Sequence, residues 1–422
     1  MITRAQLRSS AAPWVIAPAL IYTVLYVNDS VYVKSSYYAV QSGEAAAYGI
    51  AAIAPAVAAT AAWEAGRQRL LGTVRDSAAR GPVRRFLRAA APVLALQLAL
   101  SVAALFLARV TVGVWPGEAT GLLALAHLFL LPAGWLVIGW ALGNLMPRGL
   151  AAPLAAVGCW VWLAVPQATG NPYIRHLGGS VDTRSSVTDV QEPAAYTVPW
   201  LVVAGFAIAA VALAGARRRP WLAPVALAVA AAGFLTGRAL VLDWGYQVPT
   251  KPRDITLHCV GAEPRVCVPP EYAYRAVSLR IELLTPLDEL TAAGVPAPRE
   301  IRLDSSERPL EPGVWPLYWA PPPDAPKGMY DTDRHIGDLA DSAAVGTAVP
   351  RAGAENCRIP GAQARAWAAL VIGLPETEAQ GSLPYSDWVE VNRIRKLPAP
   401  DQSDWFEKSA TTGLRCPEDP TR

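Results

Sequence analysis

The ionisable and polar side chains inside apolar stretches are the first candidates for chemistry in this sequence. His127 lies near Pro132 in an apolar run from about residue 119 to 145. An ionisable residue within a membrane segment is a functional candidate by default, although a neutral imidazole can also simply hydrogen-bond a neighbouring helix. Gln97 and Ser101, one helical turn apart in the preceding apolar run, are its candidate partners. The apolar runs contain no carboxylate, which argues against a proton-relay transporter.

A second group of titratable residues lies in the polar C-terminal region, where His335 precedes Asp338 and Asp341. A metallopeptidase helix needs H-E-x-x-H, but the chain reads HIGDL from His335, so the general base and the second ligand are missing. The 331–341 stretch also lacks the EF-hand spacing for calcium, and no G-x-S-x-G sequence occurs. We therefore predict no enzymatic activity, no metal and no cofactor.

Seven apolar segments must position these residues. A membrane-spanning helix needs about 20 predominantly apolar residues, and backbone groups out of water must bond within the segment. The predicted transmembrane helices are at about 11–27, 45–63, 90–112, 119–145, 149–166, 198–216 and 220–242. The fold class is therefore a polytopic α-helical membrane domain, residues 1–242, followed by a mixed α/β domain, residues 243–422.

Charge predicts the orientation of these segments. Residues 1–242 contain 18 Lys and Arg against 8 Asp and Glu, whereas residues 243–422 contain 19 against 26. A cytoplasmic N-terminus places 13 basic residues inside and 5 outside, as the positive-inside rule requires. An odd number of spans then puts the 167–197 loop and the C-terminal domain outside the plasma membrane of a bacterial cell. The acidic tail also argues against nucleic-acid binding.

The five cysteines fit this orientation. Cys159 lies in an apolar run and is expected to pack as a small apolar residue. The other four lie in the C-terminal domain and are Cys259, Cys267, Cys357 and Cys416. An even number in an extracytoplasmic domain predicts two disulfides, with three pairings open. We favour Cys259–Cys267 and Cys357–Cys416. A metal site with His258 is the alternative, but the C-x7-C spacing does not match zinc-binding motifs.

The loop at 63–88 is the most basic segment of the membrane half. The stretch before Gly81-Pro82 has a helical composition, and arginines lead into the next span. Such charge can set topology and attract anionic lipid, or it can form a docking helix for a cytoplasmic partner. The residues predicted to dock a partner are Glu64, Arg67, Arg69, Leu70 and Arg75.

The order of these features resembles permease subunits of ABC-2-type exporters. In those proteins a first span follows a short cytoplasmic N-terminus, and a second span leads into a basic coupling segment, here Trp63–Arg88. The resemblance covers about residues 1–216. The seventh span and the outer domain depart from the six-span pattern and resemble actinobacterial permease-like proteins with a short C-x7-C segment after the last span, here within Cys259–Pro269.

This resemblance implies a permease-like subunit of an ABC exporter with a peptide, lipid or hydrophobic small molecule as cargo. The chain has no G-x-x-x-x-G-K-[ST] motif, so a separate ATP-binding cassette ATPase would supply the energy. The expected partners are this ATPase, the lipid bilayer and a second permease copy or relative in a homo- or heterodimer. The alternative is a membrane-anchored sensor or assembly factor whose outer domain binds a partner without transport.

Overall fold

The computed structural model describes two compact units within one chain. The described residues are 8–30, 36–70, 81–169, 171–181, 185–303, 305, 308–318, 334–352, 357, 359–381 and 383–415. The first unit, called here the membrane unit, contains the residues up to Ser185 and Gln191–Thr250. The second, called the C-terminal unit, contains Ser186–Val190 and the residues from Lys251 onward. The sequence predicted a boundary at 242–243 and did not anticipate that Ser186–Val190 joins the second unit.

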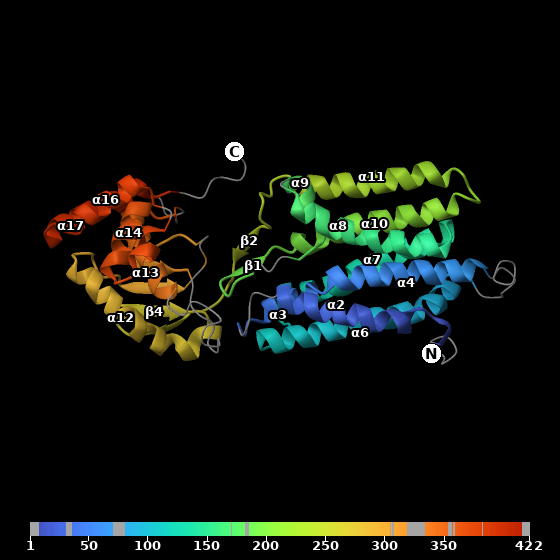
Figure 1. Ribbon diagram of the computed structural model, residues 1–422, viewed down its shortest axis with the longest axis horizontal. Helices are drawn as coiled ribbons and strands as arrows, with labels where there is room; N and C mark the ends of the chain where they lie inside the picture. The colour runs from blue at the N-terminus through green and yellow to red at the C-terminus, as the bar shows by residue number, and fades with distance from the viewer. Residues whose placement is uncertain are drawn as a thin grey trace. The chain divides into compact units, whose positions relative to one another are not determined.

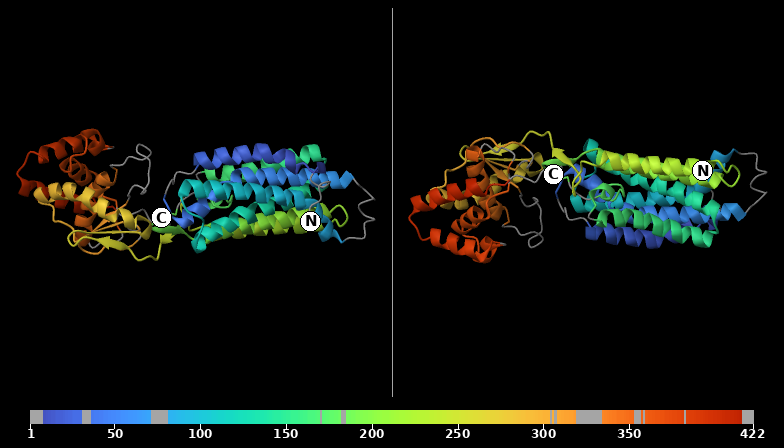
Figure 2. Two further views of the ribbon diagram at one scale, coloured as in Figure 1. Left: turned by 90° about the horizontal axis from the view of Figure 1, so that it is seen from below. Right: turned by 90° about the horizontal axis from the view of Figure 1, so that it is seen from above.

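The membrane unit is a bundle of apolar helices that run alongside one another (Figures 1 and 2). They are α2 (Ala12–Ser30), α3 (Ala39–Ala47), α4 (Ile50–Leu70), α6 (Pro82–Val112), α7 (Glu118–Leu145), α8 (Arg148–Ala168), the short α9 (Pro172–Arg175), α10 (Ala194–Gly215) and α11 (Leu222–Leu240). Five of these described helices are long and apolar enough to cross a membrane, or up to six if α3 and α4 form one span. The chain is therefore a membrane protein.

Each of the seven predicted spans coincides with helical structure, but not all meet the length requirement. The second one is broken, because α3 and α4 are bent by 40° around Tyr48 and Gly49. The first corresponds to α2, whose apolar part, Ala12–Asn28, is shorter than a full span. The coarse prediction of several membrane helices is thus correct, and the count of seven crossings stays a prediction.

Small residues let the backbones of α4 and α7 come into direct contact. A Cβ atom added to Gly139 would lie 2.2 Å from the Ala58 carbonyl oxygen, and one added to Gly143 would lie 2.1 Å from the Ala62 oxygen. These residues form a G-x-x-x-G pattern facing an A-x-x-x-A pattern, the arrangement that allows close packing between membrane helices. The close packing holds α4 against α7, and α4 also contacts α8, α6 and α2.

The outward faces of the bundle are apolar. Large exposed apolar side chains occur on α2, α6, α8 and α11, among them Ile21, Leu25, Leu98, Phe106, Val110, Leu154, Val157, Leu227 and Leu235. A water-soluble protein rarely exposes apolar patches of this extent, whereas lipid tails cover them without cost.

The C-terminal unit is a mixed α/β fold. Its four-stranded sheet has the order β3 (His258–Val260), β4 (Arg265–Val268), β5 (Glu300–Leu303) and β6 (Val314–Leu317). The β3–β4 pair is antiparallel, and the β4–β5 and β5–β6 pairs are parallel. A core of buried apolar residues lies between this sheet and the helices α12 (Ala276–Ala292), α13 (Arg334–Ala352), α14 (Ala362–Val371), α16 (Tyr385–Ile394) and α17 (Ala399–Gly413). The mixed α/β prediction is confirmed. The structure also contains the short 3-10 helix η1 (Pro270–Arg275), the short helix α15 (Glu376–Gln380) and the strand pair β1 (Asp189–Gln191) and β2 (Thr250–Pro252).

The cysteines follow the predicted pattern where they can be compared. Cys259 and Cys267 face each other across the β3–β4 pair and form a disulfide with a Cα–Cα distance of 4.0 Å. Cys357 is also disulfide-bonded, and Cys416, its predicted partner, lies outside the described residues. An antiparallel bridge between Ile359 and Arg415 brings the two chain segments together close to these positions. Cys159 is a buried free thiol in α8.

Candidate functional site

His127 is held by hydrogen bonds on both ring nitrogens. Its Nδ1 accepts a hydrogen bond from Trp200 Nε1 at 2.7 Å, and its Nε2 lies 2.8 Å from the Gly179 carbonyl oxygen. Because the indole N–H can only donate and the carbonyl can only accept, the ring is the neutral tautomer with its proton on Nε2. The ring is 1% exposed. His127 thus ties α7 to α10 and to the loop after α9, which fits the structural alternative.

The predicted partners of His127 are wrong. Gln97 donates from Nε2 to the Phe129 carbonyl oxygen at 2.7 Å, and the buried Ser101 lies one turn further along α6. Gln97 therefore does join α6 to α7, but through the backbone of α7. The spacing of apolar residues correctly predicted that Gln97 faces α7. Which atom of α7 it bonds depends on how α7 is rotated about its axis, and the sequence pattern does not contain that rotation.

A buried carboxylate that the sequence reasoning missed lies at the start of the broken helix pair. Glu44 in α3 is fully buried. Its Oε1 accepts hydrogen bonds from Ser185 Oγ at 2.5 Å and from Tyr196 Oη at 3.0 Å. Gln41, one turn earlier, donates to the Ser185 carbonyl oxygen at 2.7 Å. The apolar run predicted at 45–63 left Glu44 out, whereas α3 begins at Ala39 and includes it.

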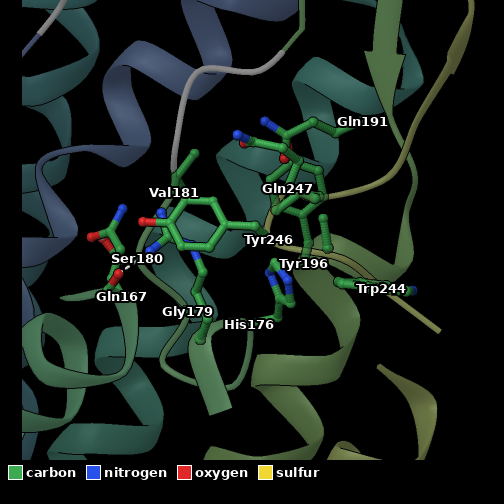
Figure 3. Close-up of a pocket in the computed structure, with 13 residues that line it drawn as sticks. Gln167, His176, Gly179, Ser180, Val181, Gln191, Tyr196, Trp244, Tyr246 and Gln247 are labelled. Carbon is green, nitrogen blue, oxygen red and sulfur yellow. Dashed lines mark hydrogen bonds between the residues drawn. The ribbon is translucent and has the colours of Figure 1, made fainter. Parts of the chain in front are cut away.

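A small pocket lies next to this network, at the end of the bundle where α8 ends and α10 begins (Figure 3). Its lining comes from the 167–181 segment, from the start of α10 and from the chain after α11. The lining residues are Gln167, Arg175, His176, Gly179, Ser180, Val181, Gln191, Ala195, Tyr196, Trp244, Tyr246, Gln247 and Val248. The pocket thus combines aromatic rings, amide side chains and one cation, with no acidic residue among these described lining residues.

Arg175 supplies the charge of the pocket. Its guanidinium lies 4.0 Å from the centre of the Tyr246 ring and donates through Nη1 to the Gln167 carbonyl oxygen. Gln167 in turn accepts a hydrogen bond from Ser180 at 2.8 Å (Figure 3). Stacking on an aromatic face orients a guanidinium and leaves its in-plane N–H donors for other acceptors.

His176 adds polarity to the pocket without charge. Burial lowers the pKa of His176 below its usual value, and the charge of Arg175 acts in the same direction, although the hydrogen bond to Gly245 opposes both. The ring Nε2 lies 2.9 Å from the Gly245 carbonyl oxygen, and the ring packs edge-on against Trp244 at 5.1 Å. The imidazole is therefore neutral at pH 7, so Arg175 dominates the electrostatics of the pocket.

The pocket and the buried polar network share residues. Tyr196 lines the pocket and donates to Glu44, and Gly179 lines it and binds His127. A ligand in the pocket would thus contact groups bonded directly to Glu44 and His127, two of the ionisable side chains buried inside the bundle. The sequence signal for this site was the polar run Gln41, Ser42 and Glu44 just ahead of an apolar segment.

The predicted docking residues lie at the opposite end of α4 and have different roles. Glu64 is fully buried, accepts hydrogen bonds from the Ala11 backbone N–H at 2.8 Å and from Ser10 Oγ at 3.1 Å, and pairs with Arg67 at 2.7 Å. Glu64 and Arg67 therefore anchor the N-terminus of α2. Leu70 is 70% exposed, Arg69 is half-buried, and Arg75 lies outside the described residues.

Asp341, one of the acidic residues that follow His335, forms an ion pair within the C-terminal unit. Asp341 pairs with Arg365 at 2.6 Å. Burial raises the pKa of Asp341, and the Arg365 guanidinium opposes this rise. In the described part of the chain no group of three or more His, Cys, Asp or Glu side chains is arranged to hold a metal ion.

Comparison with known families gives a match in the C-terminal region. A family model described as a domain of unknown function, DUF7224, matches residues 266–416, most of the C-terminal unit. No curated protein and no solved structure matches the chain.

Proposed function

We propose that the membrane unit is a permease-like subunit of an ABC-type exporter that works with a separate ATPase. The observation that carries the proposal is a pocket at one end of a bundle of apolar helices, whose lining residue Tyr196 donates a hydrogen bond to the buried carboxylate of Glu44. An ionisable side chain buried inside a membrane bundle costs free energy. Such side chains are therefore rare, and they commonly mark substrate or ion pathways. The break between α3 and α4 beside this carboxylate supports the proposal, because discontinuous helices commonly form binding sites in transporters.

The two ends of the bundle differ in charge, which supports a cytoplasmic position for the end opposite the pocket. Arg148 lies over the Trp63 ring at 4.6 Å, and Arg217 bonds the Asn144 carbonyl oxygen at 3.2 Å, so these helix ends adjoin one another. The described arginines of this basic end are Arg8, Arg67, Arg69, Arg84, Arg85, Arg88, Arg148, Arg217, Arg218 and Arg219. By the positive-inside rule this end lies in the cytoplasm, and the pocket opens on the outer side.

The basic end also offers a surface for an ATPase. Helix α6 has 31 residues and is therefore about 46 Å long, which exceeds a hydrocarbon core of about 30 Å. Its first turns then project into the cytoplasm. They expose Val83 and Leu87 at 69% and 51% beside Arg84 and Arg88, and Leu70 at the end of α4 is similarly exposed. Exposed apolar residues among cations suit a protein partner that covers them.

Affinity purification of the full-length protein from native membranes in mild detergent tests this proposal. We expect an ATP-binding cassette ATPase to co-purify with the natural chain and to be lost from the double variant Arg84→Glu, Arg88→Glu. The matched control is Arg218→Glu, Arg219→Glu, which changes the charge of the same end equally in the α10–α11 turn. An ATPase that is absent from the natural chain, or that is retained by the first variant, would contradict the proposal.

A membrane-anchored sensor or assembly factor is the second candidate function. It is favoured by an open cavity in the C-terminal unit, whose lining includes Asp387, Thr412 and Arg415. In this case the same purification would yield a partner other than an ATPase, and Asp387→Ala would release that partner.

A further inference from the structure

A cavity in the C-terminal unit lies where one helix begins and another ends. It has a volume of about 370 Å³ and is open to solvent. Its lining comes from the start of α14, the end of α17, the chain segments next to these two ends, and Asp387 of α16. Sites for small molecules typically enclose about 300–1,000 Å³. The cavity therefore has room for a small organic molecule.

Backbone contacts hold the walls of this cavity together. Gly361, the N-cap of α14, and Gly413, the last residue of α17, lie so close that a Cβ added to Gly413 would be 2.7 Å from the Gly361 Cα. Next to them, the Ile359 N–H donates to the Arg415 carbonyl oxygen at 3.1 Å, and the Arg415 N–H donates to the Ile359 oxygen at 2.9 Å. The two chain segments that form these walls are therefore fixed by the backbone.

The two helix ends present opposite partial charges to the cavity. Gly361 has no side chain that could accept hydrogen bonds from the first turn of α14, which leaves the N–H groups of Ala362 and Gln363 as donors. At the end of α17, where Thr412 and Gly413 line the cavity, the last carbonyl groups are acceptors. The start of a helix carries a partial positive charge and its end a partial negative charge.

Two charged side chains add a full charge of each sign. Asp387, half-buried in the first turn of α16, and Arg415, exposed after α17, both line the cavity. Neither side chain forms an ion pair with any residue that the structure describes. The cavity thus offers one carboxylate and one guanidinium to a ligand.

We propose that this cavity binds a small zwitterion with one ammonium and one carboxylate group, as in a free amino acid or a short peptide. Arg415 and the first N–H groups of α14 bind the carboxylate, because a guanidinium and a helix start both favour an anion. Asp387 and the last carbonyl groups of α17 bind the ammonium group, which can only donate. Ile359 and Pro360 supply an apolar part of the lining for an aliphatic side chain. This assignment deepens the second candidate function, because it names the ligand class of the proposed sensor.

Isothermal titration calorimetry on the purified full-length protein in detergent tests the proposal. The probes are L-leucine, leucyl-leucine and trileucine, and we expect saturable binding. Tightest binding of L-leucine would identify a free amino acid as the source of the zwitterion, and tightest binding of a longer probe would identify a peptide. The N-acetyl form of the tightest probe lacks the ammonium group, and its C-terminal amide lacks the carboxylate. Each should bind at least tenfold more weakly, since each loses one charge-assisted interaction.

Single variants assign the two ends of the ligand. Asp387→Asn should weaken the zwitterion at least tenfold and leave the N-acetyl form unchanged, whereas Arg415→Gln should weaken the zwitterion and leave the amide unchanged. The matched controls Asp404→Asn and Arg395→Gln change exposed residues outside the cavity lining and should bind as the natural chain does. Ala362→Trp, which fills the cavity from an exposed position, should abolish binding of every probe even if a charge variant does not fold.

The absence of saturable binding for all three zwitterions would overturn the assignment, and so would equal binding of a zwitterion and its two singly charged forms. An Asp387→Asn variant that weakens the zwitterion and its N-acetyl form equally would also contradict it. These results are independent of partner co-purification. A protein that binds the probe without any partner would keep the site and refute the sensor. A partner released by Asp387→Ala from a protein that binds no probe would keep the sensor and refute the site.

Discussion

Glu44 and Glu64 lie near opposite ends of the bent pair α3–α4, and both are fully buried. Glu64 is balanced by the Arg67 guanidinium and by a backbone N–H at the start of α2. Glu44 is bonded by the hydroxyl groups of Ser185 and Tyr196, and Tyr196 opens onto a pocket. Glu64, paired with a cation beside a helix N-terminus, holds two helices together. Glu44, bonded by the pocket-lining residue Tyr196, is placed to respond to a ligand in the pocket.

The largest expected effect comes from breaking the anchor at Glu64. Glu64→Leu removes the acceptor of the Ala11 N–H and leaves Arg67 without its carboxylate, so we expect a loss of about 4 kcal/mol in the free energy of unfolding. Thermal unfolding in detergent measures it. Glu64→Gln, which keeps an acceptor oxygen, is the control and should lose clearly less. Equal losses in both variants would show that the acceptor oxygen, which Glu64→Gln keeps, has no part in the anchor.

The packing that holds both carboxylates in place is the next target. Gly143→Ala would place a methyl group 2.1 Å from the Ala62 carbonyl oxygen and push α7 from α4, which costs about 3 kcal/mol. Gly158→Ala is the matched control, because its Cβ meets no atom within 4 Å, and better helix propensity should make it neutral or slightly stabilising. If Gly143→Ala unfolded at the same temperature as Gly158→Ala, the close approach of α4 and α7 would be refuted.

Glu44 should tolerate loss of charge better than loss of its oxygen atoms. Glu44→Gln keeps an acceptor for Ser185 and Tyr196, whereas Glu44→Leu leaves two buried hydroxyl groups without this acceptor and should cost about 2 kcal/mol. The pair of variants is compared by thermal unfolding in detergent. A Glu44→Leu protein as stable as the natural chain would remove Glu44 from the network that supports the pocket.

Glu300, a buried carboxylate of the C-terminal unit, should make the stability of that unit depend on pH. Burial tends to raise the pKa of Glu300, but hydrogen bonds from Arg265 and Arg302 outweigh it and hold the pKa below its usual value. A carboxylate whose pKa is lowered by folding stabilises the folded state at pH values above its unfolded-state pKa of about 4.3. This stabilisation is lost as the pH falls through the folded-state pKa. Because Arg265 is half exposed, we expect only about 1 kcal/mol or less.

Thermal unfolding between pH 6 and pH 3 measures this contribution. The natural chain should lose more stability over this range than Glu300→Gln, whose side chain does not titrate. Parallel pH curves for the two proteins would show that the Glu300 pairs do not stabilise the unit.

The sequence predicts local features of this fold well and distant contacts poorly. Hydropathy located the membrane helices, and the cysteine pattern predicted the Cys259–Cys267 disulfide. By contrast, Glu44 bonds residues 141 and 152 positions away, and no periodicity encodes such pairs. The same holds for Ser186–Val190, which joins the C-terminal unit through the hydrogen bond from Arg253 N–H to the Thr188 carbonyl oxygen.

Helix boundaries show the same limit. A proline tends to interrupt a helix, but α12 runs without a break from Ala276 to Ala292 and contains Pro286. Tertiary packing buries Leu283, Pro286 and Leu287 on one face and so outweighs the helix-breaking tendency of the proline.

The opposite placement of the two ends across the membrane is the claim on which this account depends, and thiol labelling on intact cells tests it most directly. Cysteines are introduced singly at the exposed Gln247, in the pocket lining, and at the exposed Arg84, at the basic end. With a maleimide that cannot cross lipid, Gln247→Cys should label on intact cells, and Arg84→Cys should label only after lysis. Labelling of Arg84→Cys on intact cells, with Gln247→Cys protected until lysis, would contradict the proposed orientation.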